Sequence, residues 1–171
     1  TGTGNFWLAT VDKDDEIIVM NSKFINCYCT GSSGAGVFYV LGNFRSINNT
    51  FDNNKATRSG GAVYVSGNQI ISINDTFTNN HADRDYGAAL FYPNGDNPTV
   101  IIENAKFINN TANGNGGALG LYGAKLINCL FENNTANGNG GAICTPTHSN
   151  SIKLSELILT DVTFKDNNAV N

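Results

Sequence analysis

The sequence predicts an all-β protein, a right-handed parallel β-helix (solenoid) of about six coils with three short strands each. One residue pattern recurs along the chain with few exceptions. The composition also favours short strands joined by tight turns, because the frequent Asn and Gly are poor helix formers while the Ile, Val, Phe and Tyr between them favour strands. Each repeat unit is too short to bury an apolar face alone, so neighbouring units must stack and share a core.

A phenylalanine anchors each unit. The anchors recur every 24 to 33 residues, as Phe24, Phe51, Phe77, Phe107, Phe131 and Phe164. In a parallel stack, equivalent positions of successive coils lie about 4.8 Å apart. We therefore expect the six rings to form a continuous stack in the core.

Asparagines stand at fixed distances from the anchor. Three residues before it lie Asn21, Asn48, Asn74, Asn104, Asn128 and Asp161. Two residues after it lie Asn26, Asn53, Asn79, Asn109, Asn133 and Asp166. Three residues after it lie Cys27, Asn54, Asn80, Asn110, Asn134 and Asn167. Such columns predict side-chain amide ladders inside the turns, and a buried amide that loses its partner costs about 1–3 kcal/mol.

Small residues complete each unit. Five residues after the anchor stand Cys29, Ala56, Ala82, Ala112, Ala136 and Ala169. Ten and eleven residues after it stand Gly34-Ala35, Gly61-Ala62, Gly87-Ala88, Gly117-Ala118 and Gly141-Ala142. These columns predict tight turns or close backbone packing, each followed by an apolar strand. The first and third units lack the Gly that precedes this pair elsewhere, which predicts looser turns there.

The chain divides into an N-terminal strand or edge segment, residues 1–20, and a six-coil repeat array, residues 21–171. The array stops where the next Gly-Ala strand should begin, so we expect it to be part of a longer protein. The open edge of its last coil predicts end-to-end self-association.

Composition excludes several classes of partner. The net charge is -4 and only 14% of residues are charged, so the chain lacks the basic stripe of a nucleic-acid-binding protein. No apolar run approaches the length that spans a bilayer, which argues against membrane insertion of this segment.

Metal sites, cofactors and disulfides are not expected. His81 and His148 fall in different units, and residues 12–16 are acidic but lack the ligand spacing of a calcium loop. Four cysteines are too few and too unevenly placed for a disulfide framework, so we expect buried free thiols at Cys27, Cys29, Cys129 and Cys144.

The motifs Phe-x-Asn-Asn-x-Ala and Gly-Gly-Ala-(Ile, Leu or Val) occur intact at residues 51–63, 107–119 and 131–143. They resemble the repeats of chlamydial polymorphic outer-membrane proteins and of adhesin-like surface proteins from methanogenic archaea. The resemblance extends from Asn21 onward. It implies an extracellular, cell-surface β-helical stalk or passenger that acts in adhesion, with a glycan or a host or partner cell surface as ligand.

We expect a non-enzymatic adhesin-like module. The alternatives are a carbohydrate-active β-helix enzyme, either a polysaccharide lyase or a hydrolase, and a purely structural spacer. Such enzymes gather acids on one strand face, whereas here Asp52 and Glu132 share one outward position three coils apart. No catalytic residue is therefore assigned.

Two sets of residues are candidates for ligand binding. Loops after the Gly-Ala strand carry Tyr92 and Asp96 in the third coil and His148 and Asn150 in the fifth, where they would flank a shallow cleft. The alternative, equally favoured, is that these are surface loops without a binding role.

The second set is an arginine pair. Arg58 and Arg84 occupy one register position in adjacent coils, with Asp83 and Asp85 flanking the second. Two stacked guanidinium groups suit a carboxylate or sulfate. The alternative is a solvated, charge-balanced loop edge.

Overall fold

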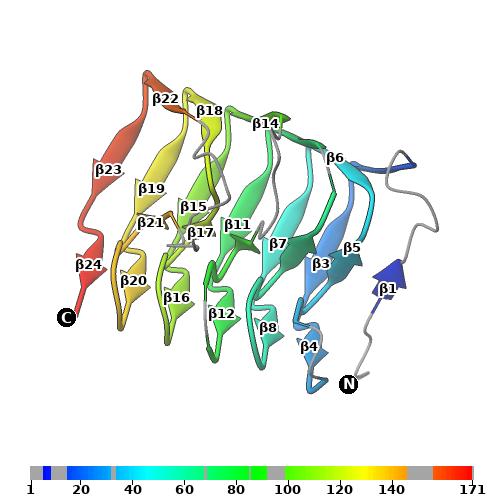
Figure 1. Cartoon of the computed structure of the whole chain (residues 1–171), viewed down its shortest axis with the longest axis horizontal. Coiled ribbons are helices and arrows are strands. Elements are labelled where there is room, and N and C mark those ends of the chain that lie inside the picture. Colours follow the sequence, from blue (N-terminus) through cyan, green and yellow to red (C-terminus); the bar gives the residue numbers. More distant parts are fainter. Residues whose placement is uncertain are drawn as a thin grey trace, which may run out of the picture.

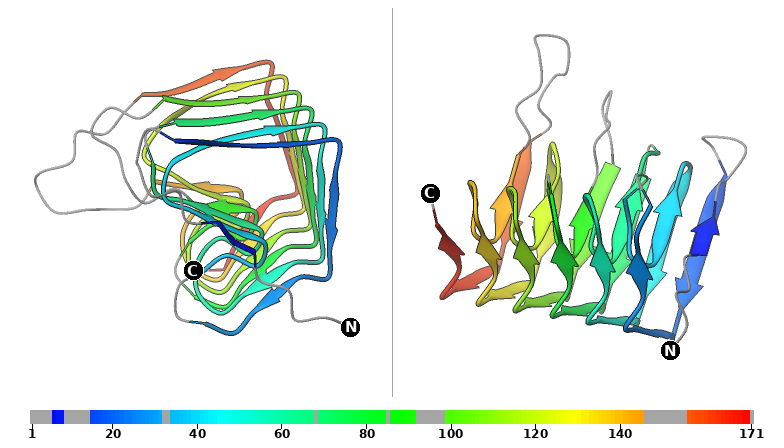
Figure 2. Two further views of the ribbon diagram at one scale, coloured as in Figure 1. Left: turned by 90° about the vertical axis from the view of Figure 1, so that its right-hand side faces the viewer. Right: turned by 90° about the horizontal axis from the view of Figure 1, so that it is seen from below.

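The computed structural model describes residues 6–8, 15–31, 34–67, 69–84, 86–91, 99–145 and 156–170. All regular secondary structure in these ranges is β-strand, arranged in four parallel sheets of six strands. Successive coils lie side by side along one axis (Figure 1). Viewed along that axis, they enclose a common interior (Figure 2). The predicted parallel β-helix is therefore confirmed.

The chain visits the four sheets in the same order in every coil. Sheet A contains β1 (Phe6–Leu8), β5 (Phe38–Val40), β9 (Val63–Val65), β13 (Leu90–Phe91), β17 (Leu119–Gly120) and β21 (Ile143–Cys144). Sheet B contains β2 (Glu16–Met20), β6 (Asn43–Ile47), β10 (Gln69–Ile73), β14 (Thr99–Glu103), β18 (Ala124–Ile127) and β22 (Leu157–Thr160). Sheet C contains β3 (Lys23–Ile25), β7 (Thr50–Asp52), β11 (Thr76–Thr78), β15 (Lys106–Ile108), β19 (Leu130–Glu132) and β23 (Thr163–Lys165). Sheet D contains β4 (Tyr28–Cys29), β8 (Lys55–Ala56), β12 (His81–Ala82), β16 (Thr111–Ala112), β20 (Thr135–Ala136) and β24 (Asn168–Ala169).

The expectation of three strands in each coil is wrong, because each coil has four. The extra strand is in sheet D, where each strand is only two residues long. A two-residue strand is too short to show the alternation that marks a strand in sequence. It is separated from sheet C by an asparagine with a positive φ, such as Asn53 at 52°.

The anchor phenylalanines form the predicted stack. Consecutive ring centroids are 4.7–5.2 Å apart along the whole column from Phe24 to Phe164. The four central rings are fully buried. Inward residues of sheets A and B, such as Val63, Ile70 and Leu119, pack against them in one continuous core.

The column three residues after the anchor is a buried amide ladder. The backbone N–H and Nδ2 of Asn80 both donate to Oδ1 of Asn110 at 3.0 Å, and Asn110 repeats this with Asn134. The Nδ2 of Asn110 also donates to the carbonyl of Phe77, at 3.0 Å. Cys27 stands at the first-coil position, where its backbone N–H donates to Oδ1 of Asn54 and its side chain has no amide to continue the ladder.

The other two asparagine columns have a different role, since they lie at exposed corners. Their members have φ between 49° and 58°, the left-handed region that Asn tolerates better than most residues. Some of these side chains bond along the stack, as when Nδ2 of Asn53 donates to Oδ1 of Asn26 at 2.6 Å. The left-handed backbone therefore favours Asn throughout these columns, and the predicted amide ladder forms only between some of their members.

The predicted Gly-Ala register is wrong in the first and third coils. The N–H of Gly36, not of Gly34, bonds to the carbonyl of Gly61 at 3.1 Å, and Phe38 pairs with Val63. The first coil is thus displaced by two residues. The turn between sheets D and A varies in length, so a fixed count from the anchor does not give the register.

In the third coil the displacement is one residue. Leu90 pairs with both Val63 and Leu119, which places Ala88 level with Gly61 and Gly117. The third coil therefore retains the positive-φ glycine, as Gly87 at 61°, and lacks the glycine after it. Its turn is not missing the first Gly of the motif, contrary to the prediction.

All four cysteines are free thiols, as expected. Cys29 and Cys129 are buried, but Cys27 and Cys144 are only half-buried. Burial raises the pKa of the Cys27, Cys129 and Cys144 thiols, so these three are less reactive than an exposed cysteine.

Candidate functional site

Four of the six candidate residues belong to the two loops that follow Gly-Ala strands. Tyr92, Asp96, His148 and Asn150 lie outside the described residues, as does Asp85. Their role as ligand contacts stays a prediction. Of the candidate residues, the structure describes Arg58 and Arg84.

Arg58 and Arg84 lie on the outer edge of the solenoid, in the turn that follows sheet D. We call this surface the sheet D edge and define it by Lys55, Arg58, His81, Asp83, Arg84, Asn113 and Asn137. Strand alternation positions it, because the alanines of β8, β12, β16 and β20 are fully buried and the preceding residue of each strand points outward. Parallel pairing then aligns Lys55 with His81 in the next coil.

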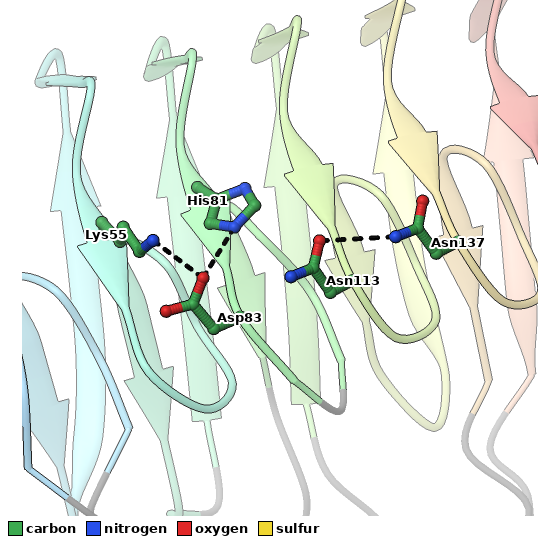
Figure 3. Close-up of polar contacts among 5 residues, drawn as sticks. All are labelled: Lys55, His81, Asp83, Asn113 and Asn137. Carbon is green, nitrogen blue, oxygen red and sulfur yellow. Dashed lines mark hydrogen bonds and ion pairs between the residues drawn. The ribbon is translucent and has the colours of Figure 1, made fainter.

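An ion network occupies the part of this edge formed by β8, β12 and the turn after β12. Oδ1 of Asp83 lies 2.8 Å from Nζ of Lys55 and 2.9 Å from Nε2 of His81 (Figure 3). Nζ of Lys55 also lies 5.9 Å from the ring centroid of Tyr28 in the first coil. Partial burial pushes the pKa of the Asp83 carboxyl upward, but hydrogen bonds and charges from Lys55 and His81 outweigh this and lower the pKa below its usual value. Asp83 is therefore ionised at neutral pH.

The arginines lie beside this network. The backbone N–H of Arg84 donates to the carbonyl of Arg58 at 3.3 Å. The two residues therefore lie in adjacent coils, with their backbones about one coil height apart. Both are exposed. Asp83, which the sequence placed as a flanking acid, bonds to Lys55 and His81.

The next two coils continue the edge with neutral amides. Nδ2 of Asn137 donates to Oδ1 of Asn113 at 3.4 Å (Figure 3), and both side chains are exposed. Behind them, the backbone N–H of Asn139 donates to Oδ1 of Asn115 at 2.8 Å. This amide row was not predicted from the sequence, although residues 135–142 repeat residues 111–118 exactly.

A second missed feature is a polar cluster inside the solenoid. Asp75 is fully buried, and its carboxylate accepts from the backbone N–H of Asn49 and the hydroxyl of Ser72, both at 2.7 Å. Nδ2 of Asn49 donates to the hydroxyl of Ser46 at 2.9 Å. Burial raises the pKa of the Asp75 carboxyl, and hydrogen bonds from Ser46, Ser72 and Asn49 offset only part of this. The cluster is closed to solvent and so is a structural feature rather than a ligand site.

The outward acids do not meet. Asp52 accepts hydrogen bonds from the hydroxyl of Thr78 at 2.7 Å and from Nδ2 of Asn79 at 2.9 Å. Glu132 pairs with Lys165 in the following coil. Among the residues that the structure describes, no three His, Cys, Asp or Glu side chains are grouped to hold a metal ion.

The fold and its outer surface define a repeat protein of the parallel β-helix class. The family model of the Chlamydia polymorphic membrane protein repeat matches the chain at two places, residues 50–66 and 128–146. Each match includes an anchor phenylalanine and the glycines that follow it, so the resemblance predicted from these motifs is confirmed there. The comparisons with curated proteins and with solved structures found no match. In the described part of the chain, no helix could span a bilayer.

Proposed function

We propose that this chain is a non-enzymatic, extracellular, adhesin-like module, a rigid β-helical stalk or passenger whose surface contacts a glycan or a cell surface. The observation that carries the proposal is the polymorphic membrane protein repeat, matched at two places on one continuous stack of coils. Repeats of this kind point to a surface protein. The proposed location is the cell surface.

Rigidity supports this role. The phenylalanine stack and the buried amide ladder bond every described coil to the next, so the solenoid resists bending between coils. A stiff rod holds a contact surface away from its point of attachment. The outer edge is free to vary because the core does not depend on it.

The distribution of acids supports a non-enzymatic role. Glycoside cleavage by paired carboxylates requires two acids roughly 5–10 Å apart across one bond. Asp52 and Glu132 are three coils apart on the stack, about 14 Å along the axis. Each also has hydrogen-bonding or ion-pair partners of its own.

The test measures binding and turnover together. The folded 171-residue chain would be applied to a glycan array and to cells, and in parallel incubated with acidic polysaccharides while new chain ends are measured. Heat-unfolded chain is the control. We expect binding that the unfolded chain lacks, without new chain ends. Cleavage would replace the proposal with a carbohydrate-active enzyme, and absence of both would leave a structural spacer.

A further inference from the structure

We propose that the sheet D edge binds an acidic oligosaccharide along the solenoid axis, with a carboxylate or sulfate group at Arg58 and Arg84 and neutral sugar units over Asn113 and Asn137. This rests on the proposed function, since it names the ligand class and the surface of the adhesin-like module.

The charge of this edge favours an anionic ligand. The chain has a net charge of -4, yet three of its ten Lys and Arg residues lie together on this edge, as Lys55, Arg58 and Arg84. The single described acid among them, Asp83, is bonded to Lys55 and His81 at 2.8 and 2.9 Å. Counted from the sequence together with Asp85, which follows Arg84, this stretch has three cations against two anions with His81 neutral, an excess of one positive charge. A local positive surface on an acidic protein attracts an anion without favouring polyanions over the whole molecule.

The arginines supply the geometry for that anion. Their backbones are hydrogen-bonded to each other across adjacent coils at 3.3 Å, so their side chains start about 4.8 Å apart. Guanidinium groups donate in a planar fork that matches carboxylate and sulfate oxygens. Both side chains are exposed, so an anion reaches them without rearrangement of the core.

The amide row extends the surface for neutral sugar units. Asn113 and Asn137 follow Asp83 in the same register column, one coil height apart, with their amides on the outer side (Figure 3). Each amide offers a donor and an acceptor, the pair that neighbouring sugar hydroxyls require. At the Arg58 and Arg84 position these coils carry Gly114 and Gly138, so this column places no side chain beside the amides.

The length of the edge is consistent with a short oligosaccharide. From the coil of Arg58 to that of Asn137 the solenoid advances about 14 Å. One coil height is close to the advance of one sugar unit in an extended polysaccharide. A linear chain lying along the axis therefore meets equivalent groups in successive coils.

The experiment titrates the folded chain with three probes: a galacturonic acid tetrasaccharide, a chondroitin sulfate tetrasaccharide, and cellotetraose as the neutral probe. Affinity is measured by calorimetry, and contacts are mapped by amide NMR shifts. We expect at least one acidic probe to bind and cellotetraose to bind more weakly. The shifts should centre on residues 55–58, 81–84 and 113–115. The two acidic probes distinguish carboxylate from sulfate as the preferred group.

Variants separate a specific site from general charge attraction. The double change Arg58→Gln with Arg84→Gln should weaken binding about tenfold or more, as expected when charge-assisted hydrogen bonds are removed. The matched control is Arg45→Gln with Lys125→Gln, which removes the same charge from the outward positions of sheet B, where Arg45 is paired with Glu16. The control should bind as the parent does. Asn113→Ala with Asn137→Ala should weaken binding without changing its salt dependence.

The outcomes separate this inference from the proposed function. Equal losses in the arginine variant and its control, or acidic probes that bind no better than cellotetraose, would overturn the acidic-glycan site. If the arginine variant then still binds cells, the adhesin-like function stands and its contact surface lies elsewhere. If the parent chain binds neither cells nor any glycan, both proposals fail.

Discussion

Replacing Asn110 by leucine tests whether the buried amide ladder holds the coils together. Asn110 occupies the middle of the ladder and is fully buried. Its Oδ1 accepts from the backbone N–H and the Nδ2 of Asn80, and its own Nδ2 donates to Asn134 and to the carbonyl of Phe77, all at 3.0 Å. Leucine has a similar size but has no polar atom to take over any of these four bonds.

The expected cost follows from the groups left unpaired. Two buried donors on Asn80 lose their acceptor, and a buried polar group without a partner costs about 1–3 kcal/mol, which gives about 2–6 kcal/mol. The lost bond to Phe77 adds to this, while the added apolar surface of leucine offsets part of it. We expect the free energy of unfolding to fall by about 4 kcal/mol, a large share of the roughly 5–15 kcal/mol typical of a domain. At about 2–4 °C per kcal/mol for a chain of this size, the melting temperature should fall by roughly 8–16 °C.

Thermal and urea unfolding followed by circular dichroism measure this change. Two control variants show how much a substitution on the outer surface changes stability. Asn113→Leu makes the same substitution at an exposed amide with one 3.4 Å partner, and Glu132→Gln changes an acid on the outer face. Both should alter stability by less than about 1 kcal/mol. If Asn110→Leu lowered the melting temperature no more than these controls, the ladder would not be a source of stability.

Three further predictions concern other parts of the solenoid. Because burial raises the pKa of Asp75, ionisation of this carboxyl disfavours the folded state, and the free energy of unfolding should decrease as pH rises from about 4 through the raised pKa. Asp75→Asn should remove that decrease, and urea unfolding should show it to be more stable than the parent at pH 7. A result in which Asp75→Asn is less stable at pH 7 and keeps the parent's pH dependence would show that the carboxylate is well accommodated. Gly117→Ala should lower the free energy of unfolding by about 3 kcal/mol in the same assay, because a Cβ there would lie 2.0 Å from the carbonyl oxygen of Gly141. A decrease below about 0.5 kcal/mol would mean that adjacent coils separate easily at this position. Finally, the inward-facing Leu157 and Phe164 of the last coil are 40% and 46% exposed, so we expect the 171-residue chain to associate end to end at high concentration. Phe164→Asp should shift its sedimentation toward the monomer. A parent chain that stays monomeric would refute this.

The sequence alone determined the solenoid, its anchor stack and its buried ladder. In a parallel stack each residue lies beside the equivalent residue of the next coil, so a column in the sequence is also a set of contacts in space. The stack of Phe51 on Phe77 and the ladder of Asn80 on Asn110 could therefore be predicted without coordinates. The outward position shared by Asp52 and Glu132 followed from the same regularity.

The predicted register was wrong where the length of the turn between sheets D and A changes. The positive-φ residue Ala35 lies six residues after Cys29, whereas the equivalent Gly60 lies only four residues after Ala56. A fixed count from the anchor phenylalanine therefore displaced the predicted register of the first coil by two residues. The same ladder was predicted for all three asparagine columns. Only the structure separates Asn54, whose amide is buried, from Asn53, whose backbone is left-handed at an exposed corner.

Only the tertiary structure decided which residues from different columns meet. Lys55 and Asp83 occupy different positions of the repeat, yet they bond across one coil because a two-residue strand and a short turn bring them to one edge. Asp75 and Ser72 form a polar cluster with Asn49 of the preceding coil. Apolar residues replace Asp75 and Ser72 in the coils that follow, so a search for periodicity does not reveal the cluster. The repeat specifies contacts between equivalent positions, because parallel pairing fixes them. Contacts between non-equivalent positions depend on the path of the chain through each turn, which the sequence pattern does not specify.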